Sequence, residues 1–281
     1  MTDPVDVAAS LLGGRRVVVL SGAGLSTDSG IPDYRGPTSV ARAPMTYQDF
    51  VSGPVAQQRY WARSFVGWRT MQHARPNAGH VSVAELEAAG AVLATITQNV
   101  DGLHQAAGAT AVIDLHGRLS QVVCLRCGER SSRRALDERL GEANPYFAAD
   151  SDQIAPDGDA ELTDVSGFHL VGCVVCGGPL KPDVVFFGEN VPRERVERCY
   201  ALVDSSQALL VLGSSLTVQS GLRFVRRARS LEIPVVIVNR GATRGDPLAD
   251  LRIDAGCSQT LQALQPRLEA LVAGPAQPAN R

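Results

Sequence analysis

Lysine is almost absent from this sequence of 281 residues. Of its 27 basic residues only Lys181 is a lysine, and all the others are arginine. We attribute this bias to genome composition rather than to function, but it leaves a single lysine for any modification of the chain itself. A surplus of one charge is also lacking, since the net charge is −2. This near-neutral balance gives no support for binding to nucleic acid or to a membrane surface.

Long apolar runs are missing as well. No uninterrupted apolar run approaches the about 20 residues that a membrane-spanning helix needs. The first residues include Asp3, Pro4 and Asp6, and they lack the basic flank and apolar core of a signal peptide. We therefore expect a cytoplasmic protein. In that reducing setting, the six cysteines are expected to be metal ligands or free thiols rather than disulfides.

What the sequence does contain is an alternation of short apolar strands with amphipathic helices. Expected strands cover 17–20, 91–97, 112–115, 208–212 and 233–238, and expected helices cover 4–13, 56–72, 80–89, 193–204, 216–229 and 258–272. This alternation predicts an α/β fold with a doubly wound, mainly parallel sheet and helices on both faces. Residues 37–55 are expected to be mostly loop, and the tail from residue 274 to be disordered.

Two pairs of cysteines interrupt the alternation. Cys124 and Cys127 form one Cys-x-x-Cys motif, and Cys173 and Cys176 form the other. Four thiolates suit a tetrahedral Zn²⁺ site with no open position, which is a structural site rather than a catalytic one. The stretch between the pairs is longer than in a usual zinc ribbon, so it contains an insertion. A redox pair at each motif is the alternative, but two matched pairs favour zinc.

Glycine-rich or polar turns follow three of the expected strands. The first is Gly22-Ala23-Gly24, where glycines let backbone N–H groups approach a diphosphate. The others are Gly213-Ser214-Ser215 and Asn239-Arg240-Gly241. Together, three such turns at neighbouring strand ends would surround one nucleotide. No clear acidic residue follows the first glycines by about 20 positions, so a hydride-transferring dehydrogenase fits poorly.

Polar side chains at two further strand ends offer catalytic groups. His116 is the best candidate for a base, because histidine exchanges protons near neutral pH. His104 competes with it on sequence alone. Asn99 and Asp101 alternate with Val100, so both side chains face one side of an extended chain and could hold a carboxamide. The alternative for this pair is a turn cap.

Several of these motifs together resemble the sirtuins, over about residues 10 to 270. They are the four cysteines, His116-Gly117, GAGLSTDSGIPDYR at 22–35, TQNVDGLH at 97–104, PDVVFFGE at 182–189 and GSSL at 213–216. The segments 59–68 and 155–159 are most similar to the class II branch, which includes a mitochondrial sirtuin associated with lipoamidase and ADP-ribosyltransferase activity. With this composition and no targeting segment, we expect a bacterial member.

The resemblance implies two domains with a cleft between them. The Rossmann-like NAD-binding domain would comprise residues 1–40, 91–120 and 182–273. The smaller inserted domain would have a helical part at 41–90 and a zinc-binding part at 121–181, and 274–281 would be a flexible tail. The implied activity is that of an NAD-dependent protein lysine deacylase, with NAD as co-substrate and one structural Zn²⁺. The implied partners are acyl-lysine proteins, with no nucleic acid and no membrane, and we expect a monomer.

The resemblance also assigns roles to individual residues. In the reaction it implies, nicotinamide leaves C1′ of NAD, the acyl oxygen attacks that carbon, and His116 removes a proton from a ribose hydroxyl; the products are nicotinamide, O-acyl-ADP-ribose and free lysine. The NAD-contacting residues would be Gly22, Ala23, Gly24, Ser26, Asp33, Tyr34 and Arg35 in the first loop, Gln98, Asn99, Val100 and Asp101 at the ribose and nicotinamide, and Gly213, Ser214, Ser215, Asn239, Arg240, Gly241 and Cys257 at the adenosine half. Val185, Phe186 and Gly188 would pair with the substrate peptide as an added strand.

One further pair bears on the choice of acyl group. Tyr60 and Arg63 stand about one helical turn apart, so both can face the same way. In some deacylases of the family such a pair grips an acidic acyl group, which predicts a preference for dicarboxylic acyl groups over acetyl. The alternative is an exposed arginine on a packing helix. Two other classes of function remain open: a protein mono-ADP-ribosyltransferase that uses the same NAD site, and a non-catalytic sensor of NAD or ADP-ribose.

Overall fold

The structure is a computed structural model that describes residues 2–36, 44–149, 151 and 155–272. Within these ranges, no helix combines the length and the apolar character needed to cross a bilayer. The predicted disordered tail from residue 274 lies outside the described residues, and so do residues 37–43 of the segment predicted as loop. The described remainder of that segment contains α2 (Tyr47–Val51), whose capping box at Thr46 and Asp49 the sequence reading missed.

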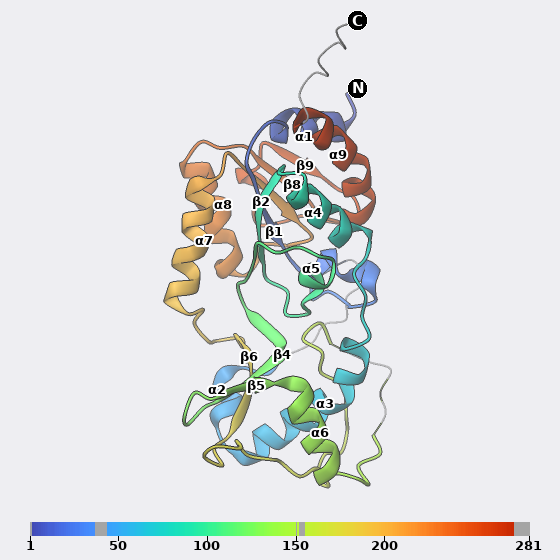
Figure 1. The fold of residues 1–281 in the computed structure, drawn as a ribbon, viewed down its shortest axis with the longest axis vertical. Coiled ribbons are helices and arrows are strands. Elements are labelled where there is room, and N and C mark those ends of the chain that lie inside the picture. The colour runs from blue at the N-terminus through green and yellow to red at the C-terminus, as the bar shows by residue number, and fades with distance from the viewer. Residues whose placement is uncertain (1, 37–43, 150, 152–154, 273–281) are drawn as a thin grey trace, which may run out of the picture.

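The larger part of the molecule is built on a six-stranded parallel sheet (Figure 1). From one edge to the other its strands are β3 (Val112–Asp114), β2 (Val92–Thr97), β1 (Val17–Ser21), β7 (Ala208–Leu212), β8 (Val235–Val238) and β9 (Leu251–Ile253). Numbered along the chain, these six strands have the order 3-2-1-4-5-6, which is the doubly wound dinucleotide-binding order. The predicted fold class is confirmed.

Helices cover both faces of this sheet. One face carries α1 (Pro4–Leu12), α4 (Ala78–Ala88) and α9 (Cys257–Val272), and the other carries α7 (Arg193–Ser205) and α8 (Gln219–Ser230) (Figure 1). Strand β1 connects the two resulting cores, because Val17 and Val19 point into one and Val18 and Leu20 into the other. Burial on both faces explains why the central strands are continuous apolar runs rather than alternating ones.

Helix α4 packs against the parallel sheet, although residues 41–90 were predicted to belong to the smaller domain. Val83 and Leu86 of α4 are fully buried in the same core as α9 and β1. The helix begins after Asn77, whose side chain accepts hydrogen bonds from the N–H groups of Gly79 and His80. The apolar face of α4 therefore packs on the parallel sheet.

A second, antiparallel sheet has the order β5-β4-β6 and lies beside three helices (Figure 1). It consists of β4 (Gly117–Cys124), β5 (Arg130–Ser132) and β6 (Leu180–Val184), and the helices are α2, α3 (Pro54–Met71) and α6 (Arg133–Ala143). The remaining short elements are α5 (Leu103–Ala106) and 3₁₀ turns at Ala23–Leu25, Thr27–Ser29 and Asp246–Leu248. We call β4–β6 with α2, α3 and α6 the small module.

The core of the small module is built around the aromatic face of α3. Trp61 and Phe65 are buried, and the indole Nε1 of Trp61 donates to the carbonyl of Leu180 at 2.9 Å. Arg133 is 1% exposed, and its guanidinium lies 5.2 Å from the ring centres of both Trp61 and Trp68. Its charge is compensated by Asp137 at 3.1 Å. The ion pair to Asp137 lies within α6, so the contacts that hold α6 against α3 are the stacking of Arg133 on the two indoles and its hydrogen bond to the carbonyl of Ser64 at 3.2 Å.

The only lysine of the chain is part of this architecture. Lys181 is 3% exposed, its Nζ donates to the carbonyl of Val184 at 2.5 Å, and it pairs with Glu189 at 3.1 Å. The Glu189 carboxylate also accepts the backbone N–H of Phe186 at 2.9 Å. Lys181 and Glu189 thus fasten the segment from 184 to 189 at both ends.

Candidate functional site

A cavity of about 530 Å³ opens at the carboxyl ends of the parallel strands. The residues that follow β1, β2, β3, β7 and β8 all contribute to its lining. Strands β1 and β7 are neighbours, and the chain order reverses between them. Such a switch point is where open α/β sheets bind ligands, because the loops on either side diverge and leave a crevice.

The turns after β1 and β7 touch through their backbones. Gly24 donates its N–H to the carbonyl of Gly213 at 2.8 Å. Gly213 has φ +62°, and a Cβ placed on it would lie 2.3 Å from the backbone nitrogen of Leu25. Only glycine satisfies both the left-handed conformation and this approach. The cavity is therefore bounded here by main chain, which suits the close approach of phosphate groups.

Nearly all the residues predicted to contact NAD line this one cavity. They are Gly22, Ala23, Gly24, Ser26, Asp33, Tyr34, Arg35, Gln98, Asn99, Val100, Asp101, Gly213, Ser214, Ser215, Asn239, Arg240 and Gly241. Cys257 lines a smaller adjoining hollow of about 70 Å³ that shares Gly24, Asp33, Gly213, Asn239 and Arg240 with it. Segments far apart in the sequence are thus brought to one place.

Asn99 and Asp101 meet at a third residue, Ser26. Asn99 Nδ2 donates to Ser26 Oγ at 3.0 Å and to the carbonyl of Gly22 at 3.1 Å. Ser26 Oγ in turn donates to Asp101 Oδ2 at 2.7 Å. Burial raises the pKa of Asp101, while hydrogen bonds from Leu103 N–H and from Ser26 act in the opposite direction. The pair is therefore fixed by the loop after β1 rather than being only a turn cap.

His116 lies at the wall of the cavity with both ring nitrogens hydrogen-bonded. Nδ1 is 2.9 Å from the carbonyl oxygen of Gln98, and Nε2 is 2.8 Å from Ser220 Oγ. A carbonyl can only accept, so Nδ1 carries the proton and Nε2 is the free base. Burial lowers the pKa of His116 to about 4, with Arg195 and Arg223 contributing in the same direction. The imidazole is consequently neutral at pH 7 and able to take up a proton.

The competing histidine has a different environment. His104 is 1% exposed, is absent from the cavity lining, and has Nε2 2.8 Å from Ser21 Oγ at the end of β1. Burial lowers its pKa to about 3. Its ring packs edge-on against His80, with centroids 5.0 Å apart. The geometry therefore favours His116 as the base and gives His104 a packing role.

The predicted acyl-binding pair is divided between two environments. Tyr60 lines the cavity and packs against Phe50 and Phe186. Arg63 does not line it, and its Nε donates to the carbonyl of Ala160 at 2.8 Å. Of these two residues, Tyr60 lines the cavity and Arg63 does not.

The predicted peptide-binding residues also line the cavity, next to His116. Val185, Phe186 and Gly188 all line the cavity, on the segment held by Lys181 and Glu189. Val185 donates its N–H to the carbonyl of His116 at 2.8 Å, which ties this wall to the candidate base. Whether a peptide pairs with it as a strand stays a prediction.

Sequence reasoning missed Ser220 and Arg223, which also line the cavity. A helix was expected from residue 216, but Leu216 has φ +55° and α8 starts at Gln219. The extra loop residues bring the start of α8 to the cavity. The available signal was Thr217 and Ser220, since short hydroxyl side chains favour the start of a helix over its interior.

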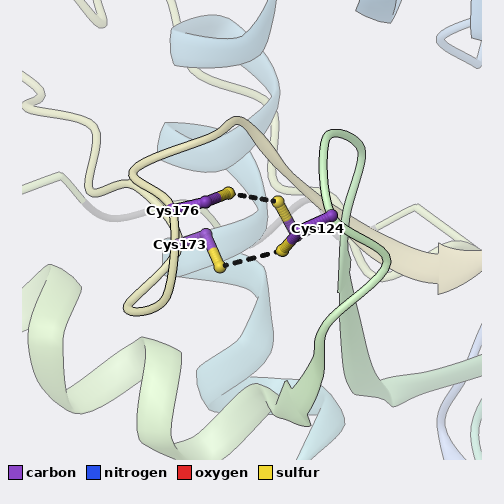
Figure 2. A group of neighbouring side chains, drawn as sticks. Cys124, Cys173 and Cys176 are labelled. Atoms are coloured by element: carbon purple, nitrogen blue, oxygen red, sulfur yellow. Dashed lines mark hydrogen bonds between the residues drawn. The ribbon is translucent and has the colours of Figure 1, made fainter.

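The four predicted metal ligands form one cluster in the small module (Figure 2). Their sulfur atoms lie within 4.8 Å of one another, with 3.5 Å between Cys124 and Cys176 and 3.8 Å between Cys127 and Cys173. Four sulfurs at about 2.3 Å from a central Zn²⁺ are about 3.8 Å apart in a tetrahedron. Backbone N–H groups of residues 126, 175 and 178 point at three of the sulfurs, each at 3.4 Å. This donor set fits a closed structural zinc site.

Comparison with known proteins agrees with this arrangement. The "Sir2 family" model matches residues 22–220. The chain is 59% identical over 271 residues to "NAD-dependent protein deacetylase 1" of Streptomyces coelicolor, covering 95% of this chain and 90% of that protein. It is 53% identical over 267 residues to "NAD-dependent protein deacetylase 1" of Mycobacterium avium, covering 93% and 95%.

Solved structures give the same result. A structure described as "Sir2-p53 peptide-NAD+" matches with a TM-score of 0.72 and 30% identity, covering 95% of this chain and 98% of that one. A structure of "Sir2Tm bound to a propionylated peptide" matches with a TM-score of 0.72 and 29% identity, covering 93% and 97%. On its sequence and its fold, the chain belongs to the Sir2 family.

Proposed function

We propose that this protein is an NAD-dependent protein lysine deacylase of the deacetylase type. The observation that carries the proposal is the cavity itself. It gathers the main-chain turns suited to a diphosphate, the Asn99–Ser26–Asp101 network and the neutral base His116 in one place. The relatives named as deacetylases and the similar structures with acylated peptide or NAD support the same conclusion.

Each group has a role that its position suits. The turns at Gly22–Gly24 and Gly213 would hold the diphosphate, and NAD, once bound, supplies an electrophilic carbon at C1′. The Asn99 and Asp101 side chains would hold the carboxamide of nicotinamide. His116 Nε2 would take a proton from a ribose hydroxyl, since Nδ1–H is already fixed on Gln98. The four-cysteine zinc site would fix the loops of the small module.

A panel of acyl-lysine peptides tests this function. We expect NAD-dependent release of nicotinamide with at least one peptide, accompanied by equal amounts of free lysine and O-acyl-ADP-ribose. Both products are separated by chromatography and identified by mass spectrometry. With adenylate-labelled NAD, label retained on protein would instead identify a mono-ADP-ribosyltransferase. No nicotinamide release with any peptide, despite NAD binding, would identify a sensor.

The segments that resemble the class II branch are in contact, and we propose membership of that branch on this basis. Arg63 of the first segment accepts a backbone hydrogen bond from Ala160 N at 3.1 Å, directly after the second segment. The Gly158 carbonyl lies so close to Gly67 that a Cβ on Gly67 would be 1.9 Å from it. The two segments therefore form one packing unit beside the cavity.

For Arg63→Ala we expect acetyl- and succinyl-peptide turnover to fall by the same factor. Arg63 supports the 155–160 loop through Ala160 and does not line the cavity, where Asp157 contributes an acidic side chain instead. The measurement is kcat/KM for both peptides with wild type and variant. A loss confined to the succinyl peptide would restore the carboxylate-binding interpretation of Arg63.

A further inference from the structure

Ser220 occupies the only basic nitrogen of the candidate base. Because Nδ1 of His116 donates to the Gln98 carbonyl, Nε2 has a lone pair, and the Ser220 hydroxyl donates to it at 2.8 Å. A neutral imidazole has no second acceptor. A substrate hydroxyl can therefore reach the base only by displacing Ser220 or by acting through it.

The position of Ser220 suits the second route. The residue is 8% exposed and lines the same cavity as Asn99 and Asp101. Its Oγ has lone pairs that are free to accept a hydrogen bond while the hydroxyl proton is given to Nε2. A substrate hydroxyl in the cavity next to Ser220 can therefore donate to Ser220 Oγ while the Ser220 hydroxyl donates to His116 Nε2.

Gln98 contacts both the candidate base and the start of α8, where Ser220 lies. A Cβ on Gly221 would lie 2.6 Å from Gln98 Oε1, so the start of α8 packs directly against Gln98. The Gln98 carbonyl accepts from His116, and the Gln98 Nε2 donates to Ser214 Oγ at 2.8 Å. The residue that orients His116 is therefore the same residue that positions Ser220.

We propose that Ser220 relays the proton from the substrate hydroxyl to His116. This inference rests on the proposed function. In the step, the O–H bond of the ribose hydroxyl breaks and its proton passes to Ser220 Oγ. At the same time the Ser220 proton passes to His116 Nε2, which gives an imidazolium that keeps its Nδ1–H on Gln98. Ser220 ends as a neutral hydroxyl, and the ribose oxygen is left as the nucleophile.

The relay is tested by separating early from late chemistry in Ser220→Ala. Exchange of labelled nicotinamide into NAD in the presence of acyl peptide reports the step before proton removal, and release of free lysine reports the whole reaction. We expect deacylation to slow about 10- to 100-fold, less than for loss of the base because water can replace the hydroxyl. Nicotinamide exchange and the KM for NAD should change less than about twofold. Ser230→Ala, at the exposed far end of the same helix, should match the wild type.

A double variant gives the decisive comparison. If Ser220 and His116 act in one path, His116→Ala with Ser220→Ala deacylates no more slowly than His116→Ala alone, to within about twofold. Three outcomes would overturn the relay. The first is a double variant whose loss equals the product of the two single losses. The others are full deacylation by Ser220→Ala, and an equal fall in nicotinamide exchange and deacylation in that variant. Full activity of His116→Ala would overturn the base assignment itself, and the absence of nicotinamide release by wild type would overturn the proposed function.

Discussion

His116→Ala is expected to lose deacylation by about 10²- to 10⁴-fold in kcat, the range found for removal of a positioned base. The physical reason is that Nε2 of His116 is the single unprotonated ring nitrogen facing the cavity, and its proton-free state is fixed by the Gln98 carbonyl. Steady-state deacylation of the best acyl peptide measures the effect. Nicotinamide exchange should fall much less, since it precedes proton removal.

The same variant should remain folded. His116 contributes two hydrogen bonds at the edge of the sheet, and losing them costs about 1–3 kcal/mol rather than the fold. Near-ultraviolet circular dichroism and the melting temperature check this. His73→Ala, which removes an exposed histidine beyond the end of α3, serves as the matched control and should keep full activity. A fully active His116→Ala would show that the base has been misassigned.

Cys124→Ser is expected to abolish zinc binding and to unfold the small module. Structural zinc sites bind with about 10–16 kcal/mol, which is as large as the whole stability of a typical domain. The cluster joins the end of β4 to the turn before β6, so its loss releases both strands of the antiparallel sheet. Zinc content by mass spectrometry and thermal unfolding measure the effect. Deacylation should fall with it, because β6 leads into the cavity wall at 184–189.

A different cysteine provides the control for the metal. Cys199 is buried in the core beside α8, away from the cluster. Cys199→Ala should therefore keep one zinc per chain while losing some stability, about 1–2 kcal/mol for a small cavity. Chelator treatment of the wild type should reproduce the Cys124→Ser melting curve, and added Zn²⁺ should reverse it. Retention of zinc and of the melting temperature by Cys124→Ser would contradict the assignment.

The parallel sheet and most of the cavity could be predicted because they depend on local signals. Apolar runs such as 208–212 mark strands buried on both faces, and the residues after them must gather at one edge once the strands are parallel. The zinc ligands were equally accessible, since Cys-x-x-Cys spacing is set by chemistry rather than by packing. These features need no knowledge of which distant segments touch.

The small module was harder because its structure depends on contacts between distant segments. Helix α6 contains few apolar residues, and beside Leu136 and Leu140 it buries Arg133 against two tryptophans of α3, a position that a charge rarely occupies. Arg63 was likewise expected either to bind an acidic acyl group or to be exposed on a packing helix, and neither expectation included its hydrogen bond to the carbonyl of Ala160. Ser220 was hidden by a helix start misplaced by three residues, from 216 to 219.

Because its single lysine is buried, the folded enzyme presents no lysine side chain that could be acylated or deacylated. Every other basic residue is an arginine, and the one ε-amino group is enclosed with Glu189 at 3% exposure, out of reach of acyl donors. In a mixture with a protein substrate, an acyl-lysine antibody would therefore report on the substrate alone. The enzyme can be added in large excess to such mixtures without contributing background signal.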